Sequence, residues 1–435
     1  MYPIPSRAQA RTALAVSAVA LLLAACGGDG NNNSARGSLL SDTTVTTQTK
    51  AQIDAITSSS ALPIQALTGT ARCDVTVRKI LHSTSGPNQV DGYTATAAVL
   101  VPVASATCPG PFPIVAYTPG TEVVKARTLS DPTQGENLLL TAFYAAQGYV
   151  VVATDYLGFT ESSLSYHPYL HADSQASTMI DAIRAARASL TNQGVPLSGR
   201  LFLTGYSQGG HAAMATHKAI EADASLGLTV TAAGPMSGPY DLTNSFVAGL
   251  SFLPTGTGGS SIFTPYVVTS WQKIYGNIYS TPADYFKAPY ATGIESLLPG
   301  TLNFTQLYTT GKLPVNLGDL LTARAVADVG DANSGFRKAL AANTLLNWTP
   351  RAPVLLCAGS RDPVVLYTVN TAASAANIKA RGGNVTEVDV EKVPAFATAL
   401  PPANATIDQL ATYHGSIVPP LCMKVVRDNL FAALR

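Results

Sequence analysis

Short apolar runs alternate with helical patterns along most of this chain, from about residue 72 to the C-terminus. The apolar runs have the length of buried strands and lie at 75–81, 93–103, 114–117, 149–153, 201–204, 353–358 and 385–390. Apolar residues recur at helical spacing over 138–147, 174–190, 209–221, 369–381 and 420–434. This alternation predicts an α/β fold, in which a mainly parallel sheet carries helices on both faces.

The alternation stops between residues 240 and 348, where Pro, Gly and Tyr interrupt scattered helical stretches. A segment of roughly 100 residues is too long for a plain loop inside a regular α/β domain. We therefore predict a mostly helical cap at 240–348, inserted into a domain that spans 66–435. Folds of this kind place their sites at the carboxyl edge of the sheet, so we expect the cap to lie over that edge.

The first 25 residues have the features of an export signal. A basic start precedes an apolar run over 12–25, which is too short to cross a bilayer comfortably. Leu23-Ala24-Ala25-Cys26 resembles the lipobox of bacterial lipoproteins, which implies cleavage before Cys26 and a lipid on its thiol. Residues 26–65 are then expected to be a flexible tether that holds the exported protein on a membrane surface. The alternative is ordinary secretion, with Cys26 incidental.

Four further cysteines can form disulfides in an oxidising compartment. Cys73 opens one strand-like run and Cys108 follows the next, so an antiparallel hairpin would bring both to one end. This favours a Cys73–Cys108 bridge, and Cys357–Cys422 follows by elimination. Buried free thiols are the alternative, especially for Cys357 in its apolar run.

The segment Gly205-Tyr206-Ser207-Gln208-Gly209 matches the pattern G-x-S-x-G. It follows the apolar strand at 201–204 and opens the helical pattern at 209–221, which is the strand–turn–helix context that a nucleophile elbow requires. The glycines let neighbouring backbone approach the sharp turn without Cβ clashes. The pattern predicts Ser207 as a catalytic nucleophile at a helix N-terminus.

A serine hydroxyl needs a base and an acid that orients the base. His414 follows the last strand and precedes the terminal helix, the place of the base in the chain order Ser, acid, His. Asp362 lies in the loop after the apolar strand at 353–358 and is the predicted acid. Its rivals are Asp389, which we expect to face solvent from a strand, and Asp408, in a loop close to His414.

Two backbone donors must stabilise the oxyanion that such a reaction forms. The residue after the nucleophile, Gln208, is expected to supply one of them. The loop after the strand at 114–117 should supply the other, with Thr121 as first choice and Gly120 as second.

From about residue 72 to its end, the chain resembles the bacterial branch of the secretory lipase family, the relatives of yeast lipase A. The resemblance implies an α/β-hydrolase fold, a Ser207–Asp362–His414 triad, a helical cap before the acid, and hydrolysis of carboxylic esters without a cofactor or metal. The matching pieces are Pro119-Gly120-Thr121, Asp155-Tyr156-Leu157-Gly158, Tyr166-His167-Pro168-Tyr169-Leu170, residues 181–186 and 205–211, Gly359-Ser360-Arg361-Asp362 and His414-Gly415.

Two other functions remain open at this point. A serine peptidase of the prolyl-oligopeptidase kind shares the fold and triad, but would need a carboxylate pair in the cap, and no convincing Glu-Glu pair is present there. A catalytically inactive domain that binds partners at the cell surface is the second. Nucleic acid is excluded as a partner, because charged residues make up only 12% of the chain and its net charge is +1.

Overall fold

A single sheet organises the protein. The computed structural model describes residues 34–59, 63–250, 259–406, 410 and 412–435. Nine strands of the described residues form one sheet in the order β1-β2-β3-β5-β4-β6-β7-β8-β9. The strands are β1 (Leu39–Gln48), β2 (Val75–Thr84), β3 (Tyr93–Pro102), β4 (Phe112–Thr118), β5 (Val150–Thr154), β6 (Leu197–Tyr206), β7 (Ala232–Met236), β8 (Val354–Ala358) and β9 (Val385–Asp389).

Six of these strands, from β5 to β9 in the sheet order, are parallel, while β1, β2 and β3 join them as an antiparallel edge. The central strands bury both faces. In β5, Val150 and Val152 pack into one core cluster, whereas Val151 and Ala153 pack into the other. The predicted α/β fold is therefore confirmed, and the two-sided burial explains why these strands are continuous apolar runs.

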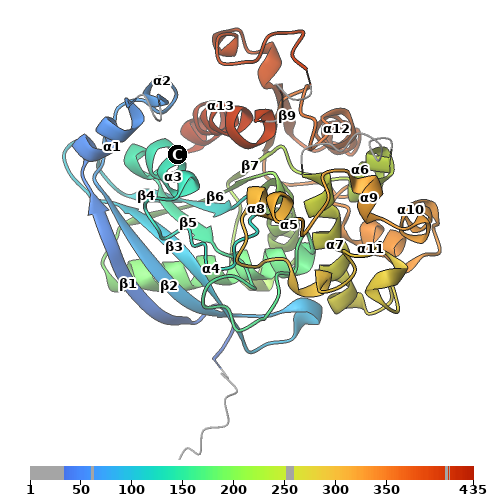
Figure 1. The fold of residues 1–435 in the computed structure, drawn as a ribbon. Coiled ribbons are helices and arrows are strands. Elements are labelled where there is room, and N and C mark those ends of the chain that lie inside the picture. The colour runs from blue at the N-terminus through green and yellow to red at the C-terminus, as the bar shows by residue number, and fades with distance from the viewer. Residues whose placement is uncertain (1–33, 60–62, 251–258, 407–409, 411) are drawn as a thin grey trace, which may run out of the picture. The chain divides into compact units, whose positions relative to one another are not determined.

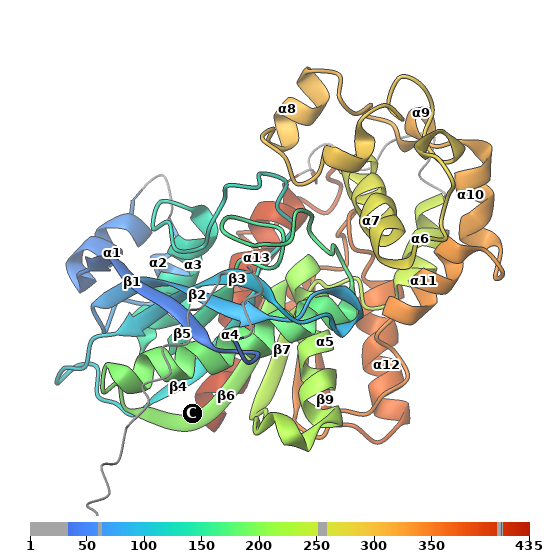
Figure 2. The same cartoon turned by 90° about the horizontal axis from the view of Figure 1, so that it is seen from below.

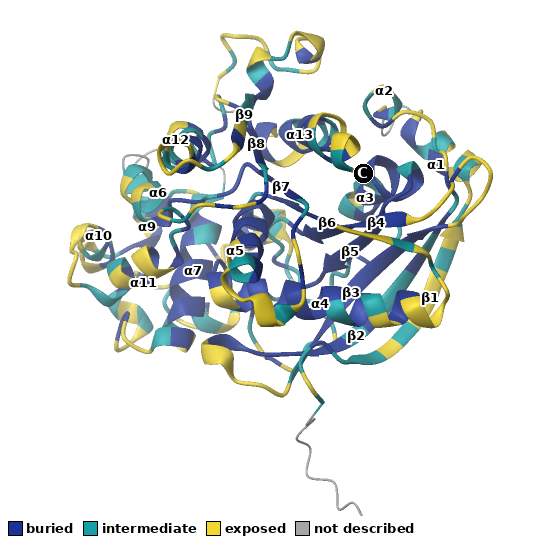
Figure 3. Ribbon diagram, turned by 180° about the vertical axis from the view of Figure 1, so that it is seen from behind, coloured by how far each residue is buried: buried dark blue, intermediate teal, exposed yellow. Residues whose placement is uncertain are grey.

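Helices cover both faces of the sheet (Figure 1). Residues of α4, α5 and α12 share one core cluster with the sheet, and those of α3 and α13 share the other. Figure 3 shows the buried strands lying between these layers. The bounds are α3 (Gly135–Phe143), α4 (Ala172–Asn192), α5 (Gln208–Ala222), α12 (Ala373–Ala380) and α13 (Val418–Val426).

The chain between β7 and β8, where a cap is predicted, contains helices that pack around a separate core cluster, to which Val123, Tyr169 and Leu170 from outside this segment also contribute. Figure 2 shows them grouped together beside the sheet and its covering helices. They are α6 (Leu242–Gly249), α7 (Ser260–Tyr275), α8 (Phe304–Thr309), α9 (Leu317–Leu320), α10 (Ala323–Gly330) and α11 (Gly335–Asn343). Aromatic contacts dominate this group, such as the packing of Phe336 against Phe246 and Trp271. We call residues 240–348 the cap.

The N-terminal region differs from its prediction. Residues 1–33, which include the predicted signal peptide and Cys26, lie outside the described residues. The predicted tether over 26–65 is too long, because β1 pairs with β2 along the edge of the sheet and α1 (Lys50–Thr57) and α2 (Gln65–Thr68) follow it. The strand was missed because its Thr-rich sequence is exposed over much of its length and carries no apolar run.

Two disulfides tie the sheet and its helices. Cys73 is bonded to Cys108 near the ends of β2 and β3, and Cys357 in β8 is bonded to Cys422 in α13. Both pairs match the predicted connectivity. Among the described residues, no helix has the length and apolar character needed to span a bilayer.

Candidate active site

A strained turn presents Ser207 at the carboxyl end of β6. The strand ends one residue before Ser207 and α5 begins one residue after it. Ser207 has φ 57° and ψ −120°, a conformation that costs an ordinary residue about 1–3 kcal/mol and persists only where its surroundings hold it. Its N–H donates to the Met236 carbonyl of β7 at 3.0 Å, which helps to hold the turn. The hydroxyl therefore stands above the sheet edge at a helix N-terminus, as an elbow requires.

The two glycines of the motif allow this turn to pack against the end of β4. A Cβ at Gly205 would overlap the side chain and carbonyl of Thr118, and one at Gly209 would overlap the same carbonyl. The Thr118 hydroxyl donates to the Gly209 carbonyl at 2.6 Å, so the packed arrangement is also hydrogen-bonded.

The structure brings Ser207, His414 and Asp362 together in a chain of hydrogen bonds. His414 Nε2 lies 2.8 Å from Ser207 Oγ, and its Nδ1 lies 2.6 Å from Asp362 Oδ2. The Asp362 side chain is fully buried, and its other oxygen accepts the backbone N–H groups of Val364 (2.8 Å) and Val365 (3.0 Å). Since the carboxylate accepts at Nδ1, that nitrogen carries the proton and Nε2 is left free to accept the serine proton.

Tyr206, the variable residue before Ser207 in the motif, holds His414 in place. Its hydroxyl donates to the His414 carbonyl at 2.5 Å. Burial, together with the nearby Asp362 charge, raises the pKa of Tyr206 well above its ordinary value, so the phenol remains a donor. The motif pattern leaves this position open, and only the fold reveals its contact.

One expectation about the rival carboxylates is wrong. Asp389 does not face solvent: it is 5% exposed at the end of β9, and its Oδ1 accepts the N–H groups of Ser360 (3.0 Å) and Glu391 (3.1 Å). It therefore anchors the loop that carries Asp362. Asp389 alternates with apolar neighbours in the sequence, and this pattern predicts a side chain that faces solvent. In the fold Asp389 ends a strand, where nearby backbone N–H groups can donate to a buried carboxylate. The other rival, Asp408, lies outside the described residues.

The loop after β4 adopts a conformation set by a charged network. Glu136 accepts the Gly120 N–H at 3.1 Å and the Tyr117 hydroxyl at 2.7 Å. Arg127 lies between Glu136, at 2.5 Å, and Glu122, at 3.0 Å. Nothing in the local sequence indicates this network, because its members come from the end of β4, the loop after it and α3, which meet only in the fold.

This network distinguishes between the two predicted loop donors. The Gly120 N–H is already used by Glu136, whereas the Thr121 N–H has no hydrogen-bond acceptor among the described residues. Thr121, Ser207 and Gln208 line the same cavity. Gln208 is the first residue of α5, so its N–H has no acceptor in a preceding helical turn.

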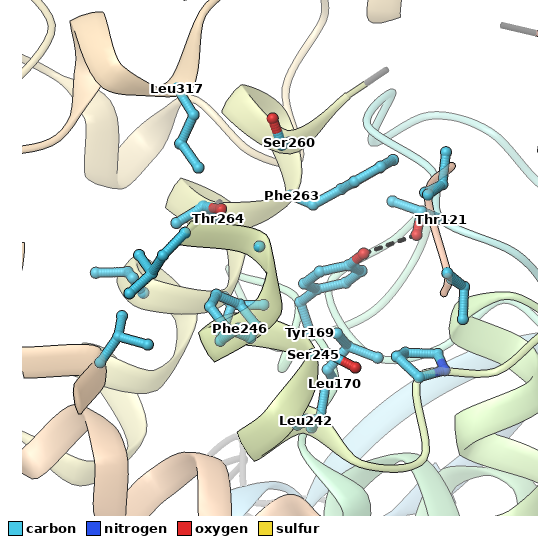
Figure 4. Close-up of a pocket in the computed structure, with 18 of the residues that line it drawn as sticks. Thr121, Tyr169, Leu170, Leu242, Ser245, Phe246, Ser260, Phe263, Thr264 and Leu317 are labelled. Carbon is cyan, nitrogen blue, oxygen red and sulfur yellow. Dashed lines mark hydrogen bonds between the residues drawn. The ribbon is translucent and has the colours of Figure 1, made fainter. Parts of the chain in front are cut away.

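The cavity beside Ser207 extends into the cap and encloses about 150 Å³. Figure 4 shows part of its lining, including Thr121, Phe246 and Phe263. Its wall is mainly apolar and comes from α6, α7 and α9 to α11. Typical members of this wall are Phe246, Phe263, Val267, Leu317, Val329 and Phe336. None of the described residues that line it carries a charge. In the described ranges, no three His, Cys, Asp or Glu side chains are arranged to hold a metal ion.

Known proteins resemble both the sequence and the structure. The secretory lipase family model matches residues 124–245. The rice cell wall degrading esterase LipA from Xanthomonas oryzae is 33% identical in sequence to this chain. Its crystal structure matches with a TM-score of 0.82, and the match covers 92% of this chain and 100% of that chain. No curated protein matches the sequence of this chain.

Two more distant structures share the fold. A hydrolase from Legionella pneumophila has a TM-score of 0.74 at 20% identity, and the match covers 91% of this chain and 98% of that chain. Candida antarctica lipase A has a TM-score of 0.59 at 17% identity, with 83% of this chain and 78% of that chain covered.

The parallel sheet with its elbow between β6 and α5 defines an α/β-hydrolase. The chain belongs to the secretory lipase family and is a carboxylic ester hydrolase, either an esterase or a lipase. Family membership thus favours an ester over a peptide substrate, and catalysis over binding alone.

Proposed function

We propose that Ser207, His414 and Asp362 carry out the ester hydrolysis through an acyl-enzyme. Ser207 Oγ attacks the ester carbonyl while His414 Nε2 takes its proton, and the same imidazole then protonates the leaving alcohol. Water, deprotonated by His414, releases the acid in a second attack. The observation that carries this proposal is the continuous chain of hydrogen bonds at 2.8 and 2.6 Å through the imidazole.

The backbone N–H groups of Gln208 and Thr121 are the proposed oxyanion donors. Both residues line the cavity beside Ser207. The engagement of Gly120 with Glu136 supports Thr121 over Gly120. Fixed donors of this kind stabilise a developing charge without reorganisation, and losing one costs about 10²–10³-fold in kcat in other hydrolases.

The proposed substrate is a neutral ester whose acyl chain occupies the apolar cavity. The absence of charged residues from the described lining supports this choice. It also argues against a peptidase, since no carboxylate in the described lining could bind a peptide ammonium group.

We further propose that the protein is exported and anchored to a membrane by a lipid on Cys26. The signal-like residues 1–25 and the two disulfides support export. The tether would be short, since β1 begins at Leu39. Expression of Cys26→Ser in a bacterial host tests the anchor: the variant should leave the membrane fraction and lose label from radioactive palmitate. A wild-type protein without label would support ordinary secretion instead.

The catalytic assignment is tested with a fluorophosphonate probe and p-nitrophenyl esters. Wild type should label once and turn over the ester, whereas Ser207→Ala should do neither. Ser245→Ala is the matched control, because Ser245 lines the same cavity outside the triad. Ester turnover by Ser207→Ala, or labelling at another serine, would contradict the assignment.

A further inference from the structure

A buried histidine outside the triad contacts the residue after the nucleophile. His167 Nδ1 lies 2.8 Å from the Leu157 carbonyl, which can only accept, so Nδ1 carries the ring proton. The other nitrogen, Nε2, is then an acceptor, and it lies 2.7 Å from the side-chain amide nitrogen of Gln208. Burial lowers the pKa of His167 to about 3, which keeps the ring neutral and this pattern intact. The imidazole thus holds the Gln208 side chain in one position.

Two residues further on, Tyr169 contacts the other proposed oxyanion residue. Its hydroxyl is hydrogen-bonded to Thr121 Oγ1 (Figure 4), and the two oxygens lie 2.8 Å apart. The Tyr169 ring stacks on Tyr266 of α7, with centroids 4.3 Å apart and planes 7° from parallel. The phenol is therefore aimed at Thr121 by a ring contact that comes from the cap.

The segment that carries both residues is fastened to α7 by buried hydrogen bonds. Ser270 Oγ donates to the His167 carbonyl at 2.9 Å and accepts the Tyr169 N–H at 3.0 Å. Trp271 Nε1 donates to the Tyr169 carbonyl at 2.9 Å. Every group in these three bonds is buried, so each bond would leave an unpaired polar atom if it broke.

We infer that the segment His167-Pro168-Tyr169 positions both oxyanion donors, and that α7 is a fixed part of this support rather than a moving lid. The inference rests on the proposed function, in which Gln208 and Thr121 supply the donors. His167 and Tyr169 do not touch the reacting atoms: they are positioning residues that act through the backbone of Gln208 and Thr121. A misplaced donor reduces stabilisation of the transition state more than it reduces binding of the ester, because the oxyanion forms only during the reaction.

The test compares kcat and KM for p-nitrophenyl butyrate in three variants. We expect His167→Leu to lower kcat about 10- to 100-fold with KM changed less than about threefold, since part of one donor's contribution is lost. Tyr169→Phe should lower kcat a few-fold. His82→Leu is the matched control: His82 is equally buried, in β2, which β3, β5 and β4 separate from β6 in the sheet, and the variant should leave kcat unchanged.

A trifluoromethyl ketone separates positioning from general loss of structure. This probe forms a hemiketal oxyanion at the serine, so its affinity should fall in proportion to kcat/KM in His167→Leu, while affinity for butyrate stays the same. A fall in kcat without loss of ketone affinity, or a rise in KM at constant kcat, would overturn the inference. Tyr169→Phe keeps the stacked ring, so it tests the inference even if His167→Leu does not fold.

The same assays distinguish this inference from the proposed function. Turnover by Ser207→Ala would refute the proposed function itself. Loss of turnover in Ser207→Ala, combined with wild-type kcat and ketone affinity in His167→Leu and Tyr169→Phe, would refute only the positioning role.

Discussion

The sheet domain and the cap contribute different things to one site. Of the proposed catalytic residues, Ser207 follows β6, Asp362 follows β8 and His414 precedes α13. All three therefore belong to the sheet domain, where hydrogen bonds join their side chains. The cap supplies most of the apolar wall and is held by aromatic packing. All five cysteines of the sequence lie outside the cap, so covalent cross-links are confined to the rest of the chain. We therefore expect the chemistry to depend on the sheet domain and substrate selection to depend on the cap, whose helix α7 contacts the sheet domain through Tyr169.

The largest effect should come from the sheet domain, at Asp362. Asp362→Asn keeps the shape but favours the wrong imidazole tautomer, and we expect kcat to fall by about 10⁴-fold. The measurement is steady-state hydrolysis of p-nitrophenyl butyrate.

Asp389→Asn is the matched control for this prediction. Asp389 fixes the loop of Asp362 but does not touch His414, so its variant should lower the melting temperature and reduce kcat much less. Equal losses of kcat in the two variants would mean that the orienting carboxylate is wrongly assigned.

The next effect concerns stability. The Cys73–Cys108 and Cys357–Cys422 bridges close loops of 35 and 65 residues, so removing either pair should cost roughly 4 kcal/mol in the free energy of unfolding. Only the second bridge joins β8, which leads to Asp362, with α13, which follows His414.

Urea unfolding and kcat of the two double Cys→Ala variants would separate these contributions. We expect both variants to be destabilised and only Cys357→Ala/Cys422→Ala to lose kcat in its folded state. Loss of kcat in the Cys73→Ala/Cys108→Ala variant would show that the remote edge of the sheet also controls the site.

A change in the cap should alter selection and leave the chemistry intact. Gly249 lines the cavity at the end of α6, and an added Cβ there would meet open space. Gly249→Trp should lower kcat/KM for p-nitrophenyl octanoate about 10- to 100-fold and leave the acetate nearly unchanged, because the larger chain loses room.

Val247→Trp, on the exposed side of the same helix, is the matched control and should affect neither ester. An equal loss on acetate and octanoate in Gly249→Trp would contradict the division between chemistry and selection.

The smallest effect per residue is a loss of stability in mild acid. Burial lowers the pKa of His82, His171 and His211 to about 4 and that of His167 to about 3, against an ordinary value of 6.5. As the pH falls from 6.5 towards 4, the unfolded chain binds protons that the folded protein excludes, so stability is complete above about 6.5 and declines below it. Each imidazole contributes up to about 1.4 kcal/mol per pH unit.

Melting curves between pH 7 and 5 test this prediction. His82→Leu removes one such group and should flatten the pH dependence by one proton. An unchanged slope in this variant would mean that His82 is protonated in the folded protein.

Much of the sheet domain could be predicted because its signals are local. Buried parallel strands are continuous apolar runs, and the elbow needs its glycines within five residues, so both are readable in sequence. The chain order of the family then predicted Asp362 and His414, which the fold brings into contact with each other and with Ser207. Two strands were not predicted from the sequence. Strand β1 is polar and half exposed, and β7 contains Gly234 and Pro235, which are unusual in a central strand.

The sequence by itself determined the fold class, the elbow and the candidate triad, because each depends on a pattern or a chain order. Only the tertiary structure showed that the Gly120 N–H is bonded to Glu136, that Asp389 is buried, that a strand begins at Leu39, and that His167 contacts Gln208. These outcomes depend on hydrogen bonds between residues that are distant in the chain, such as the Glu136 contact that occupies the Gly120 N–H. Such contacts have no periodicity, so they become visible only when the elements have packed.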